Sequence, residues 1–185
     1  MKDISSKTRH IPALENDRRP LTDRLRYDFS DYGFIVSGKL SEVFEIIPVQ
    51  VNEAEAFLFF YPKEDLKSGR FSLFNLHAFL KYTGKIDEFA HSRGTSVSTI
   101  PLEATEAFEL PALTYQRVIS MKDLFEGAPQ VIDFIGGTPD LVVRDSHTYF
   151  EHRHAHFYTG MLHEPNDNEK YDTLRQQLFA GVRLV

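Results

Sequence analysis

Two consecutive apolar segments, EIIPVQVN at 45–52 and EAFLFFYP at 55–62, most constrain the fold of this chain. Their length and their β-branched and aromatic residues predict two neighbouring strands. Successive side chains of a strand point to opposite faces, so Phe57, Phe59 and Tyr61 share one face and the apolar residues between them share the other. We therefore expect the centre of a sheet, with helices on one face and a second layer or a partner on the other.

The rest of the chain predicts short strands mixed with helices. Three segments each run from apolar residues through Ser or Asp into apolar residues three or four apart, which indicates a strand, a helix cap and a helix. They are FIVSGKLSEVF at 34–44, RVISMKDLF at 117–125 and LVVRDSHTYF at 141–150. Further helices are predicted over 74–84, over PLEATEAFEL at 101–110 and over NDNEKYDTLRQQLFAG at 166–181. The predicted class is α+β, with a mixed or antiparallel sheet and helices packed mainly on one face.

The first 25 residues differ from the remainder in composition. They are polar, contain Pro12 and Pro20 and show no sustained period, which predicts an N-terminal arm that is mobile or lies over the surface. Residues 26–185 are rich in apolar residues and form one predicted α+β domain, long enough to bury a core without staples. The domain organisation is therefore an arm at 1–25 and a single domain at 26–185.

Composition and missing motifs exclude several classes of function. The chain has no cysteine, so disulfides, thiolate zinc sites and cysteine nucleophiles are excluded. It lacks the GxSxG and GxGxxG motifs that anchor most serine hydrolases and dinucleotide-binding proteins. The sequence shows no apolar run of membrane-spanning or secretory-signal length. We expect a cytoplasmic protein without a membrane partner.

The charge of the chain is uneven. Residues 1–26 hold seven Lys or Arg against four Asp or Glu, so their net charge is +3, and with −6 for the whole chain residues 27–185 carry −9. An acidic body makes nucleic acid an unfavourable partner and attracts a basic protein. Within the predicted helix at 101–110, Glu103, Glu106 and Glu109 recur every third residue. They are either a docking surface for a basic partner or the solvated side of the helix.

The segment EHRHAHF at 151–157 raises the question of a metal site. In a strand, His152, His154 and His156 would project from one face and could close on a divalent ion. In a helix, the first and third would share a face and the second would point away. A tight site also needs a third protein ligand, which the sequence does not supply in that case. Exposed or structural imidazoles are therefore the favoured interpretation, and a metal site at these three histidines is the alternative.

The stretch YDFSDYGFIVSGKLSEVFEIIPVQVNEAEAFLFFY at 27–61 resembles small bacterial immunity proteins of polymorphic-toxin systems. Their pattern is an Asp-Phe start, a "vSekl" corner, a "flPV" strand and a tyrosine-rich strand, and LVVRDSHTYF at 141–150 resembles their second corner. The matching residues in the first stretch are Asp28, Phe29, Val36, Ser37, Leu40, Val43, Phe44, Ile47, Pro48, Val49 and Tyr61.

The resemblance implies a protein that binds and neutralises one cognate toxin, without catalysis and without a cofactor. The partner that fits the acidic body is a basic toxin protein. The alternative function is a metal-dependent hydrolase that uses His152, His154 and His156.

Overall fold

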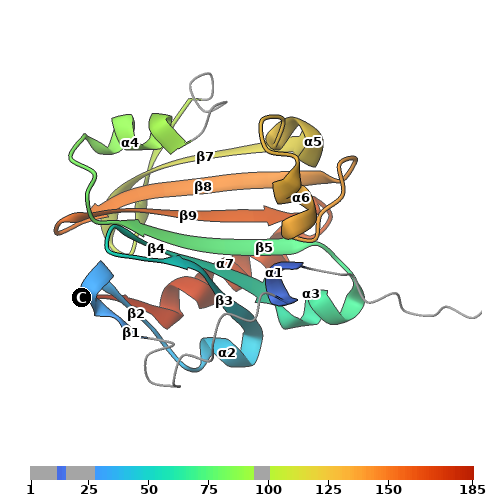
Figure 1. The fold of residues 1–185 in the computed structure, drawn as a ribbon, viewed down its shortest axis with the longest axis horizontal. Coiled ribbons are helices and arrows are strands. Elements are labelled where there is room, and N and C mark those ends of the chain that lie inside the picture. Colours follow the sequence, from blue (N-terminus) through green and yellow to red (C-terminus); the bar gives the residue numbers. More distant parts are fainter. Residues whose placement is uncertain (1–11, 16–27, 94–100) are drawn as a thin grey trace, which may run out of the picture.

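A seven-stranded antiparallel sheet forms the centre of the protein, in the order β3-β4-β5-β9-β8-β7-β6 (Figure 1). It is seen in a computed structural model that describes residues 12–15, 28–93 and 101–185. The strands are β3 (Phe44–Val51), β4 (Glu55–Pro62), β5 (Ser72–Phe79), β6 (Glu103–Ala107), β7 (Leu110–Ser120), β8 (Val142–His152) and β9 (Ala155–His163). The predicted α+β class is confirmed, and the strands expected at 45–52 and 55–62 are β3 and β4.

One face of this sheet is covered by the longest helix and a second, smaller sheet. Helix α7 (Asn168–Gly181) crosses it behind the strands in Figure 1 and buries Tyr171 and Leu178. The prediction of this helix is confirmed, and the side chain of its cap Asp167 accepts the Lys170 backbone N–H. The other elements are β1 (Asp28–Phe29), a 3₁₀ turn (Ser30–Tyr32), β2 (Phe34–Val36), α2 (Leu40–Val43) and β10 (Val182–Leu184).

Short helices lie over the two ends of the opposite face. Helices α1 (Pro12–Glu15), α5 (Met121–Leu124) and α6 (Gln130–Phe134) cover one end, and α4 (Ile86–Arg93) covers the other. Helix α3 (Lys63–Ser68) connects β4 to β5. Figure 1 shows the middle of β8 and β9 between these two groups of helices, so the described helices cover this face only in part.

Helix α1 belongs to the predicted N-terminal arm. Its Ala13 is buried in the apolar cluster that also contains residues of α5 and α6, and α1 contacts α6 and β3. This part of the arm therefore lies on the body of the protein. The rest of the arm falls outside the described residues.

Two of the three predicted strand-to-helix corners are confirmed. At 34–44, β2 leads into α2, and the Ser37 hydroxyl accepts the Lys39 backbone N–H at 3.3 Å. At 117–125, β7 leads into α5, and the Ser120 side chain accepts the Asp123 backbone N–H at 3.1 Å. Ser120 thus caps α5 by binding a backbone amide that the helix leaves unpaired, whereas Lys39 precedes α2 and that helix has no side-chain cap.

Three predicted helices are wrong. The segment 74–84 is mostly strand β5, 101–110 holds strand β6 and a hairpin turn, and 141–150 continues as β8 instead of turning into a helix. The physical reason for β5 and β8 is burial on both faces: Phe74 and Leu76 pack under α7, while Leu73 and Phe79 pack on the other face. Apolar residues on both sides of a strand give apolar spacings of three and four that imitate a helix.

Among the described helices, no span is long and apolar enough to cross a membrane.

Candidate functional site

The three glutamates of the predicted docking surface lie on a β-hairpin and not on a helix. Glu103 and Glu106 belong to β6, the edge strand of the large sheet, which pairs with β7 in antiparallel register. Glu109 lies in the two-residue turn between the strands, where Phe108 and Glu109 both have positive φ angles of 54° and 62°. Two consecutive positive φ angles are the geometry of a tight hairpin turn.

On a hairpin the glutamates are arranged differently from the stripe that a helix would give. Glu103 pairs with Thr114 and Glu106 pairs with Pro111, so the two side chains point to opposite faces of the sheet and do not form one stripe. All three glutamates are exposed. They remain gathered on one hairpin because the strand is short, and the far side of β6 pairs with no other strand among the described residues.

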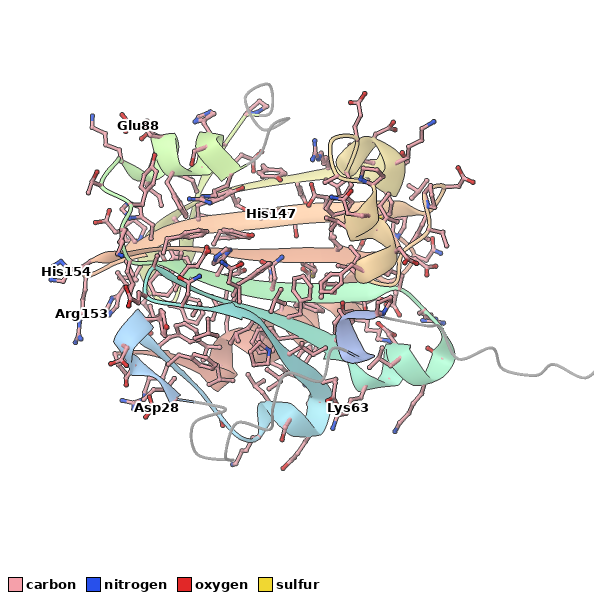
Figure 2. All side chains as sticks on the ribbon, in the orientation of Figure 1. Asp28, Lys63, Glu88, His147, Arg153 and His154 are labelled. Carbon is pink, nitrogen blue, oxygen red and sulfur yellow. The ribbon has the colours of Figure 1, made fainter. Side chains whose placement is uncertain are left out.

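The three clustered histidines are also separated. Figure 2 labels Arg153 and His154 at the tip of the β8–β9 hairpin, where they form the turn. His156 pairs with Glu151 across the hairpin, so His152 points to the opposite face from His156. The segment 151–157 is thus neither the strand nor the helix that the sequence suggested, but a hairpin.

The three imidazoles therefore do not project from one face of a strand, as a metal site at His152, His154 and His156 was expected to require. His156 is buried, and its ring lies 5.0 Å from the Tyr82 ring and 5.1 Å from the Phe89 ring. The part of the chain that the structure describes contains no group of three His, Asp or Glu side chains placed to hold a metal ion.

A cavity of about 500 Å³ lies on the partly covered face of the sheet, between the two groups of short helices. No pattern in the sequence analysis predicted this cavity. Its floor consists of side chains aligned across neighbouring strands: Asn75 pairs with Gly160, Gly160 with His147, and His147 with Tyr115. Figure 2 shows His147 in the middle of this face. Helices α5 and α6 form the wall at one end.

The polar centre of this floor is Asp145, whose side chain is completely buried. Its Oδ2 lies 2.8 Å from Arg117 Nε, its Oδ1 lies 2.9 Å from His147 Nε2, and the Tyr115 hydroxyl is 3.4 Å from Oδ2. Burial acts to raise the pKa of Asp145, but His147 and Arg117 outweigh it and leave that pKa below its usual value. The carboxylate is therefore ionised and holds both basic side chains in place.

A second polar pair lies two residues further along the strands than Asn75, on the same face. His77 Nε2 is 2.7 Å from Glu55 Oε2, and its other ring nitrogen is 3.3 Å from the Tyr158 hydroxyl. The imidazole stacks on Phe57 with ring centroids 4.4 Å apart. Burial lowers the pKa of His77 to about 4 although Glu55 acts to raise it, so the ring is neutral at pH 7.

Burial also raises the pKa values of Tyr115, Tyr149 and Tyr158, so these phenols keep their protons at neutral pH. A catalytic triad orients its histidine by a hydrogen bond to a carboxylate, whereas Asp145 Oδ1 lies 2.9 Å from His147 Nε2 without hydrogen-bond geometry. The described residues that line the cavity include no serine, threonine, cysteine or lysine to act as its nucleophile. The arrangement is suited to holding a ligand by shape, charge and hydrogen bonds.

A signal for this site was present in the sequence. Tyr115 and Arg117 alternate along one strand, and Asp145, His147 and Tyr149 alternate along another, which is the period of a sheet. The interpretation of 141–150 as a strand-to-helix corner hid the second of these alternations. That segment was also the second part of the resemblance to immunity proteins, and the structure contains no corner there.

No protein-family model and no curated protein matches this sequence. Among solved structures, the fold is similar to the solution structure of cyanobacterial PsbP (CyanoP) from Synechocystis sp. PCC 6803. The TM-score is 0.49 at 7% sequence identity, over 86% of this chain and 91% of the other.

Proposed function

We propose that this chain is a non-catalytic immunity protein that binds and neutralises a cognate bacterial toxin in the cytoplasm of the cell that produces it. The proposal rests on the resemblance of residues 27–61 to such proteins and on one feature of the surface. That feature is the acidic β6–β7 hairpin, at which Glu103, Glu106 and Glu109 are all exposed on the edge of the sheet.

The edge position gives the hairpin two ways of contacting a partner. The outer side of an edge strand carries backbone N–H and C=O groups that can pair with a strand of another protein. The glutamates around it attract a basic segment, in agreement with the charge of −9 over residues 27–185. A toxin that acts on nucleic acid commonly presents such a basic surface.

The residues that carry the resemblance are mainly packing residues. Phe29, Val36, Leu40 and Phe44 are buried in the core beneath α7. They build the scaffold and leave the choice of partner to the surface. Recognition through the exposed hairpin is compatible with that division.

The decisive experiment begins by sequencing the gene beside this chain's own gene, where we expect a toxin domain. That domain is expressed in a bacterial host with and without this protein, and growth is measured. We expect growth arrest by the toxin domain and its relief by this protein. Continued arrest, despite soluble protein in excess, contradicts the proposal.

The binding surface is tested with two variants of equal charge change. The first replaces Glu103, Glu106 and Glu109 with Lys. The second, the matched control, replaces Glu126, Asp133 and Asp140 with Lys, since these three carboxylates are also exposed and lie near the opposite end of β7.

We expect the first variant to lose protection and to associate with the toxin domain more than tenfold more slowly, with an unchanged melting temperature. Association of the parent protein should also slow as salt rises, because the Debye length falls to about 8 Å at physiological ionic strength. Equal losses in both variants show that net charge, and not the hairpin, determines binding.

A further inference from the structure

The cavity on the partly covered face is lined by none of the three hairpin glutamates, so a role for it is separate from toxin binding. Its volume of about 500 Å³ lies within the range of about 300–1,000 Å³ that small-molecule sites occupy. At the centre of its floor, Gly160 lies between Asn75 and His147. A Cβ at Gly160 would lie 2.6 Å from Asn75 Nδ2 and 2.9 Å from His147 Cε1. The two polar side chains therefore meet over the glycine, in the middle of the floor.

The charged side chains of this cavity lie at its two ends, where each contacts another group of the protein. Arg93 of α4 lies over the Phe79 ring, with the guanidinium carbon 3.8 Å from the ring centroid. At the end near α5, Arg117 Nε lies 2.8 Å from Asp145 Oδ2. The middle of the floor instead presents amide, imidazole and phenol groups. A full charge on a ligand there would exchange water for these groups, which is unfavourable, so the middle favours a neutral ligand.

The polar atoms in the middle of the floor accept hydrogen bonds. Asn75 Oδ1 is a carbonyl oxygen, and the Asp145 carboxylate 2.9 Å from His147 Nε2 favours the ring proton on that nitrogen, which leaves Nδ1 as an acceptor. Both acceptors are buried and make no hydrogen bond to the described residues. Asn75 is 7% exposed, and an acceptor at this depth is costly unless a donor binds it. Rotation of the Asn75 amide about its Cβ–Cγ bond turns Oδ1 toward the cavity and breaks no hydrogen bond of that atom.

The rest of the lining is mostly apolar, and much of it consists of flat rings. The rings belong to Phe57, Phe59, Tyr115, Phe125 and Tyr158. Aromatic rings pack favourably on one another in offset or edge-to-face contacts. We propose that this cavity binds a neutral, planar aromatic molecule that carries an O–H or N–H donor on its ring. The ring of the ligand lies among these aromatic side chains and the apolar side chains of α5 and α6, and its donor binds Asn75 Oδ1, with His147 Nδ1 beside it as a second acceptor.

The test compares four ligands that share the naphthalene ring system. They are 2-naphthol, which donates a hydrogen bond, 2-fluoronaphthalene, which has nearly the same size and no donor, the anion 2-naphthoate and the cation 2-naphthylmethylammonium. Their dissociation constants are measured by isothermal titration calorimetry on the full chain at pH 7.5. We expect 2-naphthol to bind at least about fivefold more tightly than 2-fluoronaphthalene and about tenfold more tightly than either ion, because a site that binds a donor rejects the analogue without it. The saturated alcohol 2-decalol, which is not flat, should bind at least about fivefold more weakly than 2-naphthol.

Two variants place the binding in this cavity. Asn75→Leu should weaken 2-naphthol about five- to tenfold and leave 2-fluoronaphthalene within about twofold, so that the preference for the donor disappears. Its control is Gln116→Leu, which also removes an amide, at an exposed position of β7 whose side chain points to the opposite face from Tyr115. This control should change neither affinity. Ala128→Trp should abolish binding of both ligands, because Ala128 lines the cavity and the indole would fill it.

Equal binding of 2-naphthol and 2-fluoronaphthalene overturns the assignment of a donor, and tighter binding of either ion overturns the assignment of a neutral ligand. Equal binding of 2-decalol overturns the planar body. A preference for 2-naphthol that persists in Asn75→Leu, or that is lost equally in Gln116→Leu, places the ligand elsewhere, as does binding to a folded Ala128→Trp variant. No binding of any probe overturns the proposal. If Ala128→Trp does not fold, the two amide variants decide, and none of these outcomes bears on toxin neutralisation by the hairpin.

Discussion

Removal of the buried Asp65 carboxylate should destabilise the protein strongly. Its side chain is 2% exposed, and it joins three elements of the fold. Its Oδ1 accepts from Lys170 Nζ of α7 at 2.5 Å, and its Oδ2 accepts from the Tyr171 hydroxyl at 3.0 Å and from the Ser72 hydroxyl of β5. One carboxylate of α3 therefore holds the start of α7 against the sheet.

The cost of Asp65→Ala follows from the partners it leaves behind. The hydroxyls of Ser72 and Tyr171 lose their acceptor in a buried place, and an unsatisfied buried polar group costs about 1–3 kcal/mol. Lys170 loses less, because it is 19% exposed and Glu64 Oε2 lies 3.8 Å away. We expect the free energy of unfolding to fall by about 3–5 kcal/mol, the range found when one partner of a buried pair is removed.

The assay is urea unfolding followed by circular dichroism, with thermal unfolding as a second measurement. At about 2–4 °C per kcal/mol for a chain of this length, the melting temperature should fall by roughly 6–20 °C. The matched control is Glu64→Ala, since its side chain is 83% exposed and contacts the same lysine, and exposed pairs contribute about 0–1 kcal/mol. A loss below about 1 kcal/mol for Asp65→Ala, or equal losses in the two variants, refutes the reasoning.

Three further predictions concern the open face and the arm. Gly160→Ala should lower the free energy of unfolding by about 1–3 kcal/mol, since its Cβ would overlap a cross-strand amide, whereas Gly38→Ala, with no atom within 4 Å, should not destabilise. Because the pKa of His77 is lowered to about 4 in the folded protein, the unfolded chain binds this proton at a higher pH. The free energy of unfolding should therefore fall as the pH drops from about 6.5 to about 4. In His77→Gln this contribution to the pH dependence of the unfolding free energy should disappear. A slope unchanged by the substitution would contradict it. Deleting residues 1–15 should cost about 1 kcal/mol more than deleting 1–11, because only the longer deletion removes the buried methyl group of α1; equal unfolding curves would refute this.

Local patterns predicted helix α7 and strands β3 and β4. Helix α7 was found because it has one buried side, a cap at Asp167 and a stop at Gly181. Strands β3 and β4 were found because their residues are β-branched or aromatic, and the division of Phe57 and Phe59 from Leu58 is as expected. In each case the signal lies within about fifteen neighbouring residues.

Strand β6 shows what local patterns leave out. The segment EATEAFEL has residues that favour a helix, and a glutamate at every third position supported that interpretation. The structure instead pairs all five residues of β6 with β7, and Ala107 is buried beneath the sheet. Pairing with a neighbouring strand stabilises β6 more than its intrinsic preference for a helix, and the partner is recognised only when the hairpin turn at Phe108 and Glu109 is known.

The cavity could not be predicted from local sequence patterns, for a related reason. Its floor joins Asn75 to Tyr115 through Gly160 and His147, four residues on four strands that are brought together only by the register of the sheet. A shift of one residue in any of these strands would turn its side chain to the opposite face. The alternation within a strand can be read from the sequence, whereas the alignment between strands depends on turns and packing far along the chain.

The same register explains why this face stays partly open. Strand β8 sends Phe150 to the face that α7 covers and sends Asp145 and His147 to the other. An apolar helix laid over the second set would bury polar atoms of the floor such as Asn75 Oδ1 away from water, which is unfavourable unless they are hydrogen-bonded. Covering helices are therefore favourable only at the two ends, where Met121 and Ile132 of α5 and α6, and Phe89 of α4, meet apolar residues of the sheet.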